Sequence, residues 1–303
     1  MPYPVSTSIH LRFDEEYRIS AADQAVRIAR CGFRYLDFNF LDWHGDARSP
    51  FLGDNWLSWG MEVGEAAARA GAEFNQAHAP VKGGKGPSGD FSARDLQLRA
   101  IEICGKLGIP WMVYHVILKN DDTIYDVNRE HFTSLLEACH KYNVGIAIEN
   151  IWPIMEKYSV SHTEELIRLA DYINDPLVGI CWDTGHCNVV GKSRYGWRSD
   201  AQGHLAASAD QYAQLTKIGK RLKALHIDDN GGLDDDHLEP FAGTINWNDV
   251  MRGLRDIGYE HSFTFEAHNA VRHVPEALAD RKIALLHDIG EQLVSWDEAH
   301  PFR

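Results

Sequence analysis

The sequence predicts a single (β/α)8 barrel, the TIM-barrel architecture, extending over residues 1–303. Three observations favour this fold. The chain has 303 residues, and one such barrel needs about 250 plus insertions. Short β-rich apolar runs alternate with stretches of helical period along the chain. No glycine-rich dinucleotide or phosphate fingerprint follows the first apolar run, which disfavours an open doubly wound sheet.

Eight apolar runs are predicted as strands because each is short and ends in polar residues. In chain order they are Val5–His10, Tyr35–Asn39, Glu73–His78, Trp111–His115, Gly145–Glu149, Val178–Asp183, Ala224–Asp228 and Ser262–Glu266. Alternation of strands with helices implies parallel strands joined by right-handed crossovers.

Helical periodicity predicts helices between these strands. The clearest are Ala21–Arg30, Arg94–Leu107, Arg129–Tyr142, Thr163–Tyr172, Tyr212–Leu222, Trp247–Ile257 and Val274–Leu293. Several end at a glycine or an asparagine just before the next strand, which is a C-cap signal. These residues are Gly32, Gly108, Asn143 and Gly258.

Long connections follow four of the strands and would lie at the C-terminal face of a barrel, where active sites form. They are Leu41–Trp56, Ala79–Phe91, Ile151–His162 and Cys187–Leu205. Within the second of them the run GGKGP at 83–87 predicts a mobile loop over the site.

The composition narrows the class of protein and of partner. A formal net charge of -14 disfavours nucleic acid and anionic membranes as partners. The 5 cysteines form no CxxC pair, which indicates reduced thiols rather than a disulfide framework. Neither a signal peptide nor a membrane-length apolar run is visible. We therefore expect a soluble protein in the cytoplasm.

Four consecutive predicted strands bring a carboxylate or an imidazole to the same face. Glu149, Asp183, His226 and Glu266 stand at or near the ends of these strands. Any one of them could be an ordinary hydrogen-bonded polar residue, but three unpaired carboxylates together would repel one another, and a bound dication removes that cost. Two glutamates, an aspartate and a histidine suit Mn²⁺ best, and Mg²⁺, Co²⁺ or Zn²⁺ also fit.

The runs AHAP, IEN, DTGH, LHIDDN and FEAH, in that order, resemble the xylose-isomerase-like barrel superfamily. Its members include sugar phosphate isomerases and epimerases, ketose 3-epimerases, inosose dehydratase and zinc AP endonucleases. The resemblance covers nearly the whole chain, and the ordered set is specific for the superfamily but not for the reaction. Because relatives are often dimers or tetramers, it also implies a homo-oligomer.

The ketose 3-epimerase branch implies one metal held by the residues that match Glu149, Asp183, His226 and Glu266. The residues matching Glu149 and Glu266 also act there as acid and base on opposite faces of a sugar, through a metal-stabilised enediolate. The residue matching His186 contacts substrate oxygens in that branch. Here His186 could instead orient Asp183.

The endonuclease branch implies a different site, with nine ligands for three metals. All nine positions have a match: His78, His115, Glu149, Asp183, His186, His226, Asp235, His237 and Glu266. Three departures oppose a nuclease. APVKGG follows His78 in place of an aromatic residue, VILKNDD follows His115 in place of a glycine-serine-histidine turn, and Gly185 replaces a cysteine. We therefore interpret His78, His115 and His237 as substrate-pocket residues, or as structural ones.

Aromatic side chains near the predicted strand ends could stack on a sugar or pack the loops onto the barrel. Trp152, shortly after Glu149, is our candidate for substrate contact. The leading hypothesis is a metal-dependent sugar isomerase or epimerase. A lyase or dehydratase on a keto-sugar, keto-inositol or 3-keto glycoside, and a zinc AP endonuclease-like phosphodiesterase, are the alternatives; a silent binding protein ranks last.

Overall fold

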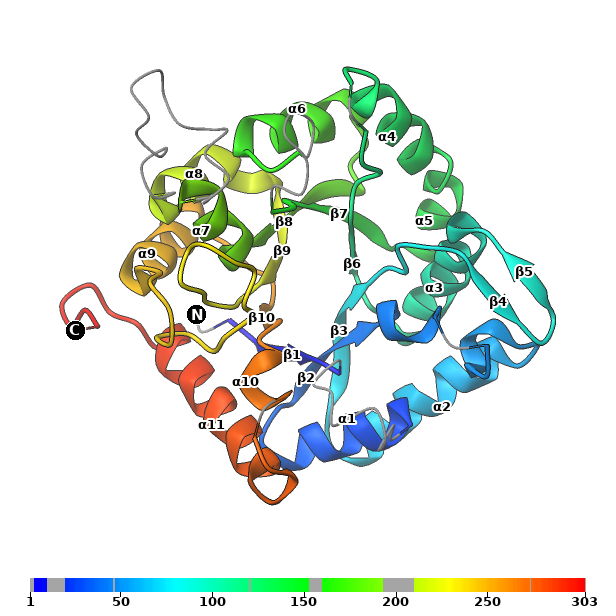
Figure 1. Ribbon diagram of the computed structural model, residues 1–303, viewed down its shortest axis with the longest axis horizontal. Coiled ribbons are helices and arrows are strands. Elements are labelled where there is room, and N and C mark those ends of the chain that lie inside the picture. Colours follow the sequence, from blue (N-terminus) through cyan, green and yellow to red (C-terminus); the bar gives the residue numbers. More distant parts are fainter. Residues whose placement is uncertain are drawn as a thin grey trace.

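The computed structural model shows eight parallel strands in a nearly closed ring, with helices outside it (Figure 1). It describes residues 3–9, 20–45, 47–119, 121–152, 160–192, 210–272 and 274–302. The strands of the ring are β1 (Val5–Ser8), β2 (Tyr35–Asn39), β3 (Glu73–His78), β6 (Trp111–Tyr114), β7 (Gly145–Glu149), β8 (Val178–Asp183), β9 (Leu222–His226) and β10 (Phe263–Phe265).

The strand order confirms a (β/α)8 barrel. Neighbours in the sheet run β10-β1-β2-β3-β6-β7-β8-β9, all parallel. A parallel bridge between Ile227, just after β9, and Phe265 of β10 links the two ends of this order. The C-terminal ends of all eight strands therefore open at one face, where we expected the site.

The connecting helices surround the strands (Figure 1). They are α1 (Ala21–Arg30), α2 (Trp56–Arg69), α3 (Ala93–Leu107), α4 (Ile124–Thr133), α5 (Leu136–Tyr142), α6 (Thr163–Ile173), α7 (Thr184–Lys192), α8 (Gln211–Ile218), α9 (Trp247–Ile257), α10 (Asn269–Arg272) and α11 (Glu276–Val294), with short 3-10 turns η2 (Leu41–Trp43), η3 (Pro50–Leu52) and η4 (Gly219–Arg221). Gly108, Asn143 and Gly258 are left-handed C-caps, as their positions predicted.

Three sequence-based expectations need correction. The stretch Arg129–Tyr142 is not one helix, because α4 ends at Thr133 and α5 begins at Leu136. The 83–87 run is not an irregular loop; it lies in a hairpin of β4 (Gly84–Gly86) and β5 (Gly89–Phe91). Its glycines allow close packing, since a Cβ at Gly86 would lie 2.5 Å from the Cβ of Leu52. The connection from Cys187 begins inside α7 rather than in a loop.

The inside of the barrel differs from its outside. A large apolar cluster fills the layer between strands and helices, whereas Val113, Ala147, Cys181 and Ala224 form a separate small cluster. Side chains two residues apart on a strand point to the same side. Glu149, Asp183 and His226 therefore lie directly beyond Ala147, Cys181 and Ala224, on the inward face and toward the C-terminal end.

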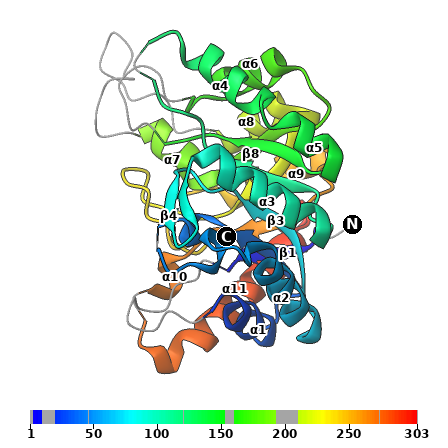
Figure 2. The same ribbon diagram turned by 90° about the vertical axis from the view of Figure 1, so that its right-hand side faces the viewer.

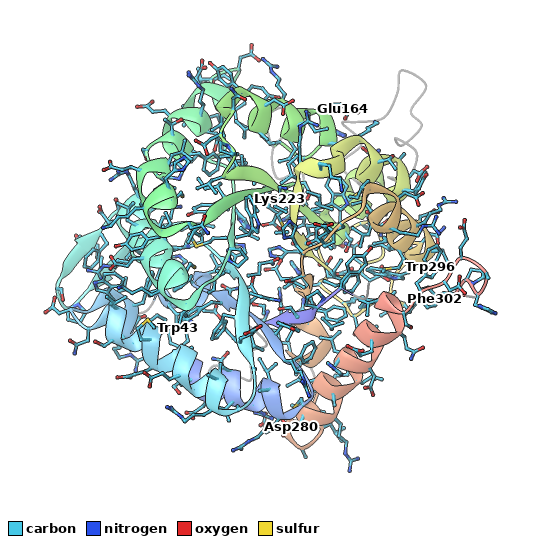
Figure 3. The ribbon with its side chains drawn as sticks, turned by 180° about the vertical axis from the view of Figure 1, so that it is seen from behind. Trp43, Glu164, Lys223, Asp280, Trp296 and Phe302 are labelled. Carbon is cyan, nitrogen blue, oxygen red and sulfur yellow. The ribbon has the colours of Figure 1, made fainter. Side chains whose placement is uncertain are left out.

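The two ends of the barrel are seen from the side in Figure 2, with β4 and α7 on one side and the N-terminus on the other. Seen from behind, Lys223 of β9 lies among the strands, while Glu164 of α6 and Asp280 of α11 lie in the outer layer (Figure 3). None of the helices in the described part of the chain combines the length and apolar character that a membrane crossing requires. All five cysteines are free.

One core hydroxyl gives a test of this packing. Tyr114 of β6 is buried, and within the described residues its hydroxyl has no hydrogen-bond partner. A buried polar group without a partner costs free energy. We expect Tyr114→Phe to leave the free energy of unfolding unchanged or to raise it by about 1 kcal/mol in urea denaturation.

The matched control is Tyr259→Phe, because the buried Tyr259 hydroxyl donates to the carbonyl oxygen of Ser262 at 2.8 Å. This variant should lose about 1 kcal/mol. Equal losses in the two variants would contradict the packing described for Tyr114.

Candidate functional site

Four titratable side chains converge at the C-terminal mouth of the barrel. Glu149 ends β7, Asp183 ends β8, His226 ends β9 and Glu266 directly follows β10; all four are buried. The Nδ1 atom of His226 lies 3.0 Å from Oε1 of Glu149, 3.1 Å from Oε2 of Glu266 and 4.0 Å from Oδ2 of Asp183. The structure thus brings together the four residues predicted as metal ligands, with one ligand atom of each within 4.8 Å of the others.

The donor set fits a divalent cation. Three carboxylates and one imidazole share a buried space, and Oδ2 of Asp183 is buried without a hydrogen-bond partner among the described residues. Burial of carboxylates in this proximity is costly unless a positive charge accompanies them. Glu149, Asp183, His226 and Glu266 are therefore the residues that could hold the ion, with hard oxygen donors and one nitrogen.

Two further histidines adjoin this group on the side of β3 and β6. His78 ends β3, and His115 directly follows β6. The Nε2 atoms of the two lie 3.1 Å apart, and they lie 3.6 Å and 3.0 Å, respectively, from Oε2 of Glu149. Glu149 thus contacts His226 with one oxygen and His115 with the other.

A second cluster lies on the other side of Asp183. His186 stands in the first turn of α7, and Asp235 and His237 belong to the connection after β9. Asp235 joins the two histidines, with Oδ1 at 3.5 Å from Nε2 of His186 and Oδ2 at 3.1 Å from Nε2 of His237. These three residues also have the spacing of a metal group.

The tautomers of three of these histidines follow from their backbone contacts. Nδ1 of His78 lies 2.9 Å from the carbonyl oxygen of Ala79, and Nδ1 of His186 lies 2.7 Å from that of Asn150. Nδ1 of His237 lies 2.9 Å from the carbonyl oxygen of Glu266. Because a carbonyl can only accept, Nδ1 carries a proton in each case, and Nε2 is the nitrogen that faces the neighbouring carboxylates or a bound ion.

Two residues that contact the site, Asn150 and Asp228, were not predicted from the sequence. Asn150 clamps the backbone of Asp183, since its Oδ1 accepts from the Asp183 N–H at 2.7 Å and its Nδ2 donates to the Asp183 carbonyl at 2.9 Å. Asp228 is buried beside His237 and the start of α7. In the sequence both residues are marked only by their position next to the end of a strand, and this position does not indicate which residues they contact.

The electrostatics of the site follow from burial and pairing. Burial alone would raise the pKa of Glu149, but His226 and His115 outweigh it and hold that pKa well below its usual value. Burial alone would lower the pKa of His226, but its neighbours, including Glu266 and Glu149, raise it well above the ordinary value. The pKa of Asp183 is raised, by burial first and then by Asp228.

The aromatic residues are less informative. Trp152 is half-buried and packs against the large apolar cluster. Its role in substrate binding stays a prediction.

The chain belongs to the family described as xylose isomerase-like TIM barrel, whose profile matches residues 26–289. A relative in Sinorhizobium fredii, the uncharacterized protein y4fM, is 25% identical over 277 residues, which are 80% of this chain and 81% of that protein. The family match confirms the superfamily resemblance found in the sequence.

Solved structures with the same fold include sugar-acting enzymes. A D-tagatose 3-epimerase-like protein has a TM-score of 0.66 at 20% identity, over 97% of each chain. The 3-keto-D-glucoside 4-epimerase of E. coli has a TM-score of 0.65 at 14% identity, over 94% of this chain and 99% of that one. The IolI protein, solved with a zinc atom, has a TM-score of 0.65 at 16% identity, over 97% and 98%. At these identities the likeness shows the fold.

The raised histidine pKa values give a prediction for metal binding. His226, His186 and His237 all have a pKa well above the ordinary value in the metal-free protein, where carboxylates outweigh the lowering effect of burial. They therefore hold protons at neutral pH, and a metal ion must displace a proton from each histidine that it binds. We expect the affinity for Mn²⁺ or Zn²⁺ to rise with pH and to weaken toward about pH 6.

Calorimetric titration in buffers of different ionisation enthalpy measures the protons released. Release of at least one proton per ion at pH 7 is expected, and the His226→Gln variant serves as the comparison. An affinity that does not change with pH would show that these imidazoles are not displaced.

Proposed function

We propose that this member of the xylose isomerase-like TIM barrel family is a divalent-metal-dependent sugar isomerase or epimerase. The observation that carries the proposal is the pair of buried glutamates, Glu149 and Glu266, whose carboxylate oxygens lie 3.0 Å and 3.1 Å from Nδ1 of His226. Such a pair can remove a proton from one carbon and return it, which is the chemistry of isomerisation and epimerisation. Sugar-acting structural neighbours support the substrate class.

Both glutamates are in the state that a base requires. Burial favours their neutral forms, but nearby histidines, His226 first, hold the pKa of each well below the ordinary value. Each therefore carries a negative charge at neutral pH. A divalent ion held by the four-residue group would polarise the carbonyl and hydroxyl oxygens of a sugar.

The proposed reaction uses the two carboxylates in turn. One takes the proton from the carbon α to the substrate carbonyl and later releases it to solvent. The other, which also starts charged, takes a proton from solvent and delivers it to that carbon to give the product. His186, His78 and His115 would bind substrate hydroxyls, because all three adjoin the four-residue group. Nδ1 of His186 lies 3.6 Å from Asp183, and Nε2 of His78 and of His115 lie 3.6 Å and 3.0 Å from Glu149. His237 and Trp152 complete the proposed substrate pocket.

The metal is proposed to be manganese. Three oxygen donors and one imidazole make a mostly hard site, which suits Mn²⁺, although the zinc in the IolI structure shows that a relative takes another dication. We also propose a small sugar rather than nucleic acid as the substrate, a homo-oligomer as the assembly and the cytoplasm as the place of action.

The cluster of His186, Asp235 and His237 favours a second candidate, a phosphodiesterase related to the AP endonucleases. This cluster, together with His78, could hold further ions beside the four-residue group, and several ions at one centre suit the hydrolysis of phosphate esters. The same residues serve the first candidate as substrate contacts.

Substitution of the glutamates tests the proton transfer. We expect Glu149→Gln and Glu266→Gln each to lower kcat by about 100-fold or more, because the amide cannot accept the proton. The assay is exchange of solvent deuterium into a panel of ketoses and 3-keto glycosides, followed by NMR, with product mass to separate epimerisation from elimination. Full activity in both variants would refute the mechanism.

Glu165→Gln is the matched control, because Glu165 caps α6 through the N–H groups of Ser161 and His162 and is not one of the four residues of the proposed metal group. It should alter stability but leave kcat unchanged. Metal content is measured in every variant, so that loss of the ion is distinguished from loss of the base.

Metal content per chain separates the two candidate functions. About one ion per chain in protein purified without added metal is expected for the isomerase. Two or three zinc ions per chain, with nicking of abasic DNA, would instead favour the phosphodiesterase. Elemental mass spectrometry measures the number of metal ions per chain, and a plasmid assay measures the nicking of abasic DNA.

A further inference from the structure

We propose that Asp228 is a positioning residue for His237, and that residue 185 is glycine because the Asp228 carboxylate occupies the space of a side chain there. The proposal deepens the proposed function and rests on it in one respect, that His237 contacts a bound ion or substrate. Its steric part is independent of the reaction.

The contact between Asp228 and Gly185 is unusually close. Oδ1 of Asp228 accepts a hydrogen bond from the Gly185 N–H at 2.8 Å. A Cβ at residue 185 would lie 2.2 Å from this oxygen and 2.8 Å from the Cγ of Asp228. A side chain at residue 185 would therefore force the carboxylate to move. The present position of the Asp228 carboxylate thus requires a glycine at residue 185.

Asp228 cannot move without a loss of stability, because burial and hydrogen bonds hold both its backbone and its carboxylate in place. It is fully buried. The Thr184 hydroxyl donates to its carbonyl oxygen at 2.7 Å. Displacement of the carboxylate would leave the Gly185 N–H without its acceptor in a buried place, which is costly.

The second oxygen of Asp228 lies beside the histidine. Oδ2 is at an ion-pair distance of 3.0 Å from Nδ1 of His237, whereas the hydrogen bond of this nitrogen goes to the Glu266 carbonyl oxygen at 2.9 Å, and Oδ2 is left without a hydrogen bond among the described residues. Nε2 of the same ring faces Asp235, at 3.1 Å from its Oδ2. A carboxylate beside one ring nitrogen of an imidazole fixes the orientation of the ring. It also makes the other ring nitrogen a stronger electron-pair donor to a metal ion.

This arrangement links the Asp183-Thr184-Gly185-His186 run to the connection after β9. The run that carries Asp183 and His186 ends β8 and begins α7, whereas His237 comes about ten residues after β9. Asp228 touches both segments, through Gly185 and through His237. Asp228 therefore sets the position of His237 relative to His186. The cluster of His186, Asp235 and His237 depends on this relative position, because Asp235 contacts both histidines.

The steric part is tested by a double-mutant cycle on the full chain. Gly185→Ala should lower Tm by roughly 3–6 °C in the wild-type background. In an Asp228→Ala background, which lacks the carboxylate, the same change should cost little further. Equal shifts of Tm in the two backgrounds would overturn the dependence of Gly185 on Asp228.

The positioning part is tested by titration with Co²⁺. Where a second ion binds at the cluster of His186, Asp235 and His237, Asp228→Asn, which keeps the shape but not the charge, should weaken the binding of that ion by about 10–100-fold, as should His237→Ala. In the His237→Ala background, Asp228→Asn should have no further effect, and the change in the Co²⁺ visible spectrum should follow the same pattern. Additive effects of the two substitutions would overturn the proposal.

A chain that binds no Co²⁺ would refute the metal-dependent function, and a chain that binds a single Co²⁺ at the four-residue group would leave His237 to the substrate, but neither result would refute the positioning of His237. In that case the ring-nitrogen chemical shifts of ¹⁵N-labelled histidine decide, with the His237 signal assigned by its loss in His237→Ala. Asp228→Asn should shift the His237 signal and leave that of His140 unchanged, since His140 pairs with Asp175 instead. An unshifted His237 signal would overturn the proposal.

Discussion

The burial of several carboxylates at the mouth of one barrel is the constraint on which the rest of the site depends. Glu149, Asp183 and Glu266 are all buried around His226. Without a compensating positive charge the cost of such burial would exceed what packing could supply. In the metal-free chain neighbouring charged groups raise the pKa values of His226 and His186 against the lowering effect of burial, and burial raises the pKa of Asp183; a divalent ion would supply the positive charge instead.

The same constraint explains the shape of the barrel interior. Small residues of β7, β8 and β9, namely Ala147, Cys181 and Ala224, lie directly below the charged layer. The charged side chains can then point along the barrel and inward rather than toward solvent. The backbone takes part as well, since carbonyls of Ala79, Asn150 and Glu266 fix the imidazoles of the surrounding histidines. The site is therefore built mostly from strand ends, which a barrel holds rigidly.

The strands and the residues at their ends could be predicted from the periodicity of the sequence. Features of the connections between strands could not. Eight strands and the convergence of Glu149, Asp183, His226 and Glu266 follow from apolar runs that end in polar residues. The break between α4 and α5 and the β4–β5 hairpin have no such periodic signal. Asp228 and Asn150 were missed because their role lies in contacts between strands, Asp228 with Gly185 and Asn150 with Asp183. His10, the last residue of the first predicted strand, and residues 193–205 of the last long connection lie outside the described residues.

The surroundings of the site bear on the choice between a sugar and a nucleic acid. Duplex DNA carries about one negative charge per 1.7 Å of its axis, so its binding needs unpaired cations along the approach. The connection after β3 offers Lys82 and Lys85, but Lys85 lies 3.8 Å from Asp90 of the same hairpin. The chain as a whole has a formal net charge of -14. A neutral sugar needs no cationic approach, and this is why we propose a small substrate.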